Sequence, residues 1–160
     1  MKYLFVLLSL ICINTTAMAQ EITTQITIKA TPEKVWAVLT DFKKYPDWNP
    51  FIRSVEGNVE VGEKIKVIIH PPEAKEMTFR PIVLTKTDEK ELSWFGTLFF
   101  RGIFDGEHRF EIVDNNDGTV TLKHSEKFRG VLVWMFNTKK TEAGFILMNE
   151  KIKEIAETQQ

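Results

Sequence analysis

The C-terminal part of the chain carries one apolar stripe at helical spacing. From about Val131 onward, stripe residues recur at alternating intervals of four and three, and charged residues such as Lys139, Lys153 and Glu157 fall between them. This period predicts one long amphipathic helix that packs on one face and leaves the other to water. The stripe consists of Trp134, Thr138, Thr141, Phe145, Met148, Ile152 and Ile155.

The middle of the chain, residues 51–128, has the pattern of consecutive strands instead. Alternating β-branched and aromatic residues are separated by Gly, Pro, Asn and Asp, which is typical of strands joined by turns. After a weak strand that ends at Gly62, the sequence predicts strands over 65–69, 79–85, 92–100, 106–113 and 119–128. Runs of antiparallel strands with segregated helices indicate an α+β fold.

The spacing of apolar residues changes from the period of a strand to that of a helix near Thr31. Residues 22–30 alternate and predict a strand, and Thr31 and Pro32 then supply a good N-cap and a suitable first helical residue. We expect this helix to stop near Asp41 and to be followed by a short helical turn that Pro50 closes.

The first residues have the pattern of a secretory signal peptide. Lys2 precedes an apolar run over residues 3–13, and small residues flank Met18 at a candidate cleavage site. We expect cleavage after Ala19, export to the periplasm or the medium, and a single mature domain over 20–160. The apolar run is too short to span a bilayer, so no stable membrane insertion is expected after cleavage.

Charge and cysteine content exclude several classes of function. The formal net charge is −1 and both signs are interspersed, so nucleic acid is not an expected partner. Cys12 is the only cysteine and leaves with the signal peptide, which removes disulfide and thiolate chemistry. The sequence contains no nucleophile motif, phosphate-binding glycine loop or zinc-ligand spacing, and we expect no cofactor and no metal.

Several short motifs lie along the mature chain. They are Ile28-Lys29-Ala30-Thr31-Pro32-Glu33-Lys34-Val35-Trp36, Asp41-Phe42, Tyr45-Pro46-Asp47-Trp48-Asn49-Pro50-Phe51, Leu92-Ser93-Trp94, Gly106-Glu107-His108-Arg109-Phe110 and His124-Ser125-Glu126-Lys127-Phe128-Arg129-Gly130. These motifs resemble those of START-like domains, the polyketide cyclase/dehydrase and lipid-transfer superfamily also called SRPBCC, and the similarity covers nearly all of the mature chain. The resemblance implies a helix-grip fold, in which a curved antiparallel sheet of about seven strands wraps a long C-terminal helix around an apolar cavity.

The last hairpin places polar groups on an apolar face. A five-residue loop over 114–118 predicts that His108 lies opposite His124, and strand alternation puts both on the inward face with Glu126. Three interpretations stay open for these side chains. They satisfy one another's hydrogen bonds, they orient a ligand or transfer a proton to it, or they form a two-histidine, one-carboxylate metal site.

The resemblance and the aromatic content lead to one function with two alternatives. Twelve phenylalanines and four tryptophans suit an apolar pocket, so we expect a protein that holds a small hydrophobic, lipid- or polyketide-like molecule. The alternatives are a cyclase or hydratase that uses His108, His124 and Glu126, and a co-chaperone-like interaction module that uses the apolar stretch 98–104. The protein partner is not specified. The expected ligand-binding residues are Trp94, Leu98, His108, Phe110, Ile112, Leu122, His124, Phe145 and Met148.

Overall fold

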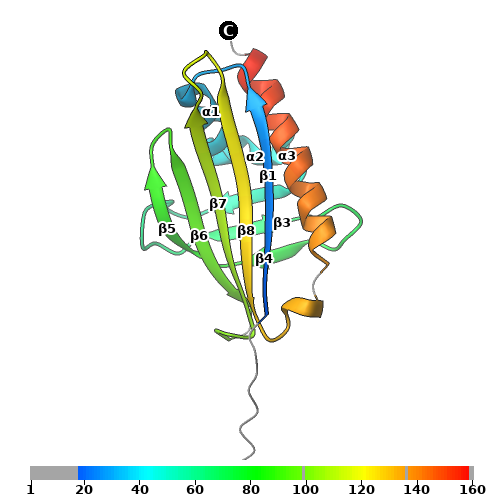
Figure 1. The fold of residues 1–160 in the computed structure, drawn as a ribbon. Helices are drawn as coiled ribbons and strands as arrows, with labels where there is room; N and C mark the ends of the chain where they lie inside the picture. Colours follow the sequence, from blue (N-terminus) through cyan, green and yellow to red (C-terminus); the bar gives the residue numbers. More distant parts are fainter. Residues whose placement is uncertain (1–17, 99, 136, 159–160) are drawn as a thin grey trace, which may run out of the picture.

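The computed structural model describes residues 18–98, 100–135 and 137–158, so the expected signal peptide lies almost entirely outside the described residues. Within them, antiparallel strands and helices follow in the order expected for an α+β fold (Figure 1). The elements are β1 (Met18–Ile28), α1 (Pro32–Thr40), the 3-10 turn η1 (Phe42–Lys44), α2 (Tyr45–Trp48), β2 (Ile52–Glu56), β3 (Lys66–Ile69), β4 (Met77–Phe79), β5 (Ile82–Thr87), β6 (Glu91–Leu98), β7 (Phe104–Asp114), β8 (Val120–Gly130), the 3-10 turn η2 (Val133–Met135) and α3 (Thr138–Thr158).

The strands form two sheets that enclose the core together with α3. Five strands pair antiparallel in the order β1-β8-β7-β6-β5, and three pair in the order β2-β3-β4. Figure 1 shows α3 lying alongside β1, while the smaller sheet runs across behind the larger one. The predicted helix-grip fold is therefore confirmed, with eight strands within the described ranges in place of about seven.

The additional strand comes from a break at Pro81. The sequence predicted one strand over 79–85, but the chain forms β4 before Pro81 and β5 after it. Proline has no N–H for a strand ladder, and the Pro81 carbonyl accepts a hydrogen bond from Ile65 N at 3.0 Å. An isolated bridge between Lys64, which precedes β3, and Ile82 on β5 then joins the two sheets.

The helix starts follow local chemistry. Thr31 caps α1 by accepting a hydrogen bond from Lys34 N at 3.4 Å, and Pro32 is the first helical residue, as predicted. The long helix starts later than predicted, at Thr138, because the chain first makes the separate turn η2. Trp134 lies in that turn with 63% of its surface exposed, so its place on the packed stripe was wrong.

The predicted hairpin register was wrong by two residues. Ile112 pairs with Leu122, and His108 pairs with Glu126 and not with His124. The loop covers 115–119, because Asp117 accepts hydrogen bonds from the backbone and hydroxyl of Thr119 and so draws this residue into the turn. A shift of two keeps every side chain on its predicted face, and the inward positions of the two histidines are confirmed.

Two further observations concern the predictions about membrane insertion and signal cleavage. None of the helices within the described residues has the length and apolar character needed to cross a bilayer. The cleavage site predicted after Ala19 falls inside β1, whose first two residues pair with Gly130 and Arg129.

Candidate functional site

A chain of buried and half-buried polar side chains connects four elements across the core. It runs from Thr24 on β1 through Asn149 on α3 to His124 on β8, then to His108 on β7 and Glu126 on β8. The successive distances are 3.0, 3.0, 2.9 and 3.5 Å. His124 is fully buried and His108 is 5% exposed, so these contacts replace water for both rings.

One end of the chain fixes the direction of the hydrogen bonds. The Thr24 hydroxyl donates to the backbone carbonyl of His124 at 3.2 Å, so it accepts from Asn149 Nδ2. The Asn149 carbonyl oxygen therefore faces His124 Nδ1 and accepts its N–H. In the neutral imidazole this leaves His124 Nε2 as an acceptor for the Nε2–H of His108.

The direction of these bonds defines which ring nitrogen of His108 faces the carboxyl group of Glu126. With Nε2 donating to His124, His108 Nδ1 faces Glu126 Oε2 at 3.5 Å. Because two lone pairs cannot form a hydrogen bond, a direct bond between these two atoms would need a proton on one of them.

Aromatic rings hold both histidines in place. The ring of His108 stacks on Trp94 with centroids 4.8 Å apart and an interplanar angle of 1°, and His124 stacks on Phe145 at 3.6 Å and 12°. Burial lowers the pKa of His124 well below its ordinary value, the neighbouring His108 lowers it further, and the hydrogen bond with Asn149 opposes both. His124 is thus held neutral, as its acceptor role requires.

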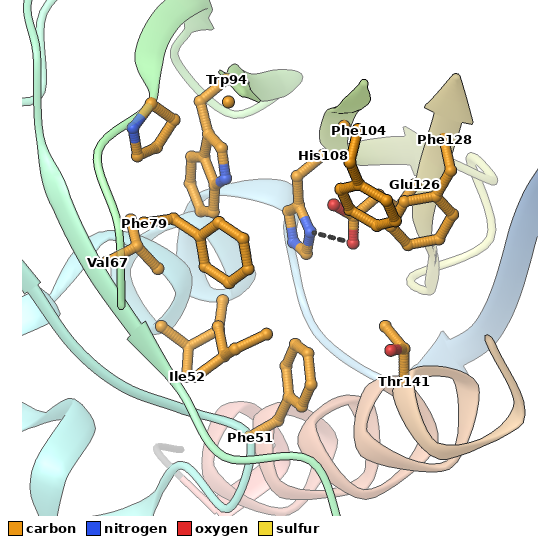
Figure 2. Close-up of a pocket in the computed structure, with 14 residues that line it drawn as sticks. Phe51, Ile52, Val67, Phe79, Trp94, Phe104, His108, Glu126, Phe128 and Thr141 are labelled. Carbon is orange, nitrogen blue, oxygen red and sulfur yellow. Dashed lines mark hydrogen bonds and ion pairs between the residues drawn. The ribbon is translucent and has the colours of Figure 1, made fainter. Parts of the chain in front are cut away.

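The polar chain ends at an apolar pocket between the two sheets and the start of α3 (Figure 2). The cavity measures about 50 Å³, enough for a few water molecules. Glu126 reaches it past Gly106, where an added Cβ would lie 2.8 Å from the carboxylate. The lining residues are Phe51, Ile52, Val67, Ile69, Phe79, Pro81, Trp94, Gly96, Phe104, Gly106, His108, Glu126, Phe128 and Thr141.

One lining residue has an unsatisfied polar group. Thr141 is 1% exposed, and its hydroxyl has no hydrogen-bond partner among the described residues. Figure 2 shows Thr141 on the helix side of the pocket, across from the labelled His108 and Glu126. A buried hydroxyl without a partner costs about 1–3 kcal/mol, so the site has a polar group that a ligand can satisfy.

Comparison with known families identifies the fold. Residues 19–144 match the family described as "Polyketide cyclase / dehydrase and lipid transport". The chain belongs to this family. The match includes the strands that carry both histidines and Glu126, and it supports a domain that binds a hydrophobic ligand.

Several solved structures have the same fold as this chain, although their sequence identity to it is low. Norcoclaurine synthase from Thalictrum flavum, in complex with dopamine and hydroxybenzaldehyde, gives a TM-score of 0.68 at 14% identity, with 99% of each chain covered. A protein from Chromobacterium violaceum gives 0.69 at 14% identity, covering 87% of this chain and 98% of that one. A Staphylococcus aureus protein of unknown function gives 0.66 at 18% identity, covering 92% and 100%. No curated protein sequence matches the chain.

The predicted site residues fall into three groups by their position relative to the pocket. Trp94 and His108 line the pocket. A second group is buried in the core but does not line the pocket: Phe110, Ile112, Leu122, His124, Phe145 and Met148. Leu98 lies at the end of β6, outside the lining and 37% exposed.

Sequence reasoning missed Asn149 and the roles of Thr24 and Thr141. Asn149 follows Phe145 by four positions and precedes Ile152 by three, which places it on the packed face of the helix. A polar residue at that spacing was the available signal. For the metal interpretation, the described residues contain no group of three or more His, Cys, Asp or Glu placed to hold an ion.

The neutral state of His124 leads to a prediction about stability. On unfolding, His124 regains a pKa near 6.5, so below that pH the unfolded state binds a proton that the folded state does not. Acidification from pH 7.5 to 5.5 should therefore lower the free energy of unfolding, by up to about 1.4 kcal/mol per pH unit below 6.5 from this group. Urea unfolding of the parent and of His124→Gln, which cannot gain this charge, measures the difference.

The same assignment is visible by nitrogen NMR. His124 should show a protonated Nδ1 and an unprotonated Nε2 throughout this pH range. An imidazolium pattern for His124 at pH 5.5 would show that the direction of the hydrogen bonds is not the one derived above.

Proposed function

We propose that this chain binds a small hydrophobic molecule with one polar group, its apolar body in the pocket and its polar group between Thr141 and the His108–Glu126 pair. The observation that carries the proposal is the unsatisfied Thr141 hydroxyl in an otherwise apolar wall. Binding sites commonly combine apolar lining with a few convergent polar groups. Family membership and the norcoclaurine synthase complex support the same class of ligand.

The size of the cavity defines how such a ligand enters. A space of about 50 Å³ is smaller than the roughly 150 Å³ of a benzene-binding cavity. A lipid- or polyketide-like ligand therefore requires one wall to move. The three-stranded sheet supports that movement best, because β3 and β4 are four and three residues long, whereas the opposite wall is formed by eleven-residue strands.

The proposal includes export to the periplasm or the medium. Its support is the N-terminal pattern of Lys2, the apolar run over 3–13 and the small residues around Met18. Intact mass of the protein isolated from its own host tests this part, because cleavage after Ala19 gives a chain that starts at Gln20.

Filling the pocket should abolish ligand retention. Gly96 lines the cavity from β6, and a Cβ there would make only ordinary contact with Pro81 at 3.5 Å. Gly96→Leu should therefore fold and occupy the space. In native mass spectrometry of protein from its own host, the parent should carry an extractable adduct of a few hundred daltons that Gly96→Leu lacks.

Thr97→Leu is the matched control, because Thr97 is the next residue on β6 and is exposed. This variant should keep the adduct. A parent protein without any adduct, or an adduct retained by Gly96→Leu, would contradict binding in this pocket.

Thr141→Val should separate ligand binding from stability. Removing the unsatisfied hydroxyl should raise the free energy of unfolding by about 1 kcal/mol. The same change should weaken binding of 2-naphthol about two- to tenfold, since one ligand hydrogen bond is lost. Fluorescence titration measures the affinity, and urea unfolding measures the stability.

Naphthalene is the control ligand, because it lacks the hydroxyl and should bind both proteins equally. Equal 2-naphthol affinities for the parent and Thr141→Val would show that Thr141 does not contact the polar group of the ligand.

The position of the His108–Glu126 pair supports a second function, acid–base catalysis on a bound carbonyl compound. Both side chains line the pocket, and the Thr24–Asn149–His124 chain orients the ring of His108 there. A cyclase or hydratase needs a group in that position that gives and takes a proton. His108 and Glu126 would act on the substrate, and His124 would orient His108.

Hydrogen–deuterium exchange at the α-carbon of 2-tetralone tests this second function. The parent should accelerate exchange over buffer, and Glu126→Gln should reduce the acceleration about 100-fold or more. Glutamine keeps the shape but cannot take up the proton. Exchange at the buffer rate in the parent, or undiminished exchange in a folded Glu126→Gln, would remove the catalytic function and leave the binding function standing.

A further inference from the structure

One end of the molecule presents a cluster of exposed apolar side chains, which we call the end patch. It joins the β6–β7 loop to the segment after β8, at the lower end of the large sheet in Figure 1. Backbone hydrogen bonds from Val131 N to Gly102 O at 3.1 Å and from Leu132 N to Ile103 O at 3.0 Å hold the two segments together. The end patch comprises Leu98, Phe100, Val131, Leu132, Trp134 and Met135, exposed by 37, 75, 41, 37, 63 and 65%.

The backbone keeps these side chains pointing outward. Gly130 has a φ of +138° and lies against the Ile103 carbonyl so closely that a Cβ would overlap it. Asp105 accepts a hydrogen bond from Gly102 N at 2.9 Å and fixes the loop. Val133 is fully buried between exposed neighbours. Ordered exposure of this many apolar side chains marks an interaction surface.

Positive charges predominate around the end patch. Arg101, Arg129, Lys139 and Lys140 flank it. The nearby carboxylate of Asp105 is 8% exposed and accepts the hydrogen bond from Gly102 N. Lys140 contacts a backbone carbonyl, that of Glu73, at 2.7 Å. Aromatic and aliphatic side chains surrounded by Lys and Arg suit the interface of an anionic bilayer, where the rings enter the headgroup region and the cations meet phosphates.

We propose that the end patch docks on the surface of an anionic lipid bilayer. The pocket lining includes Phe104 and Phe128, which are close in sequence to the two patch segments. Docking would bring this part of the lining toward the bilayer, where hydrophobic molecules are concentrated. The proposal rests on the surface alone and does not require the ligand proposed above.

Vesicle co-sedimentation tests the proposal with the protein as isolated from its host. Vesicles containing about one third phosphatidylglycerol in phosphatidylcholine should bind the parent more tightly than phosphatidylcholine alone, by roughly fivefold per engaged cation. Phe100→Ser/Trp134→Ser should lose about tenfold or more in partitioning. Arg129→Glu/Lys139→Glu should lose the preference for the anionic lipid.

The matched control is Ile146→Ser/Leu147→Ser, which removes two side chains that are each 48% exposed on α3, outside the end patch. It should bind vesicles like the parent. Brominated acyl chains should quench the parent's tryptophan emission, and Trp134→Phe should remove that quenching. This readout reports contact of the end patch itself, whatever else binds the vesicle.

Equal partitioning of the parent and Phe100→Ser/Trp134→Ser, or unquenched Trp134, would overturn the docking proposal. Stable capture of a protein through the end patch without vesicle binding would overturn it as well. In vesicle-free buffer, 2-naphthol should bind Phe100→Ser/Trp134→Ser as it binds the parent. Loss of naphthol binding with intact vesicle binding would count only against the pocket.

Discussion

The hydrogen bond between His124 and Asn149 sets how α3 sits on the large sheet. Both side chains are buried, at 0 and 2% exposure, so a rotation or slide of the helix would leave two polar groups without partners in an apolar core. Apolar contacts alone tolerate such shifts more easily, because they lack direction. The same bond fixes the tautomer of His124 and, through it, the donor atom of His108. The position of α3 and the hydrogen bonding of the pocket thus both depend on the His124–Asn149 contact.

Strand alternation explains why the faces of the site were predictable although the register was not. A register error of two residues moves a side chain along the strand but leaves it on the same face, whereas an error of one would reverse it. The inward positions of His108, His124 and Glu126 follow from alternation alone. Their pairing depends on how Asp117 and Thr119 close the turn. The residue composition of the loop suggests its approximate length but does not reveal these hydrogen bonds.

Other parts of the site arise from contacts between distant segments, and the sequence offers only a weak signal for them. Asn149 and Thr24 meet across 125 positions, and nothing local to either residue identifies the other. The helical stripe correctly predicted that Thr141 is packed. That its hydroxyl finds no partner depends on the walls opposite, including Phe51, whose ring occupies the space beside Gly144. Pro81 shows the converse case, where a purely local signal for a strand break was available.

The two walls of the pocket differ in how firmly they are held. The polar chain and the ladder of ten residue pairs between β7 and β8 immobilise the wall that carries His108 and Glu126. The β2-β3-β4 wall has short strands, and it joins the large sheet through the Lys64–Ile82 bridge and a few neighbouring backbone hydrogen bonds instead of a long ladder, so it needs less free energy to open locally. A site that must stay closed in water and open for an apolar ligand needs this asymmetry. The rigid wall keeps the polar groups in position while the opposite wall moves.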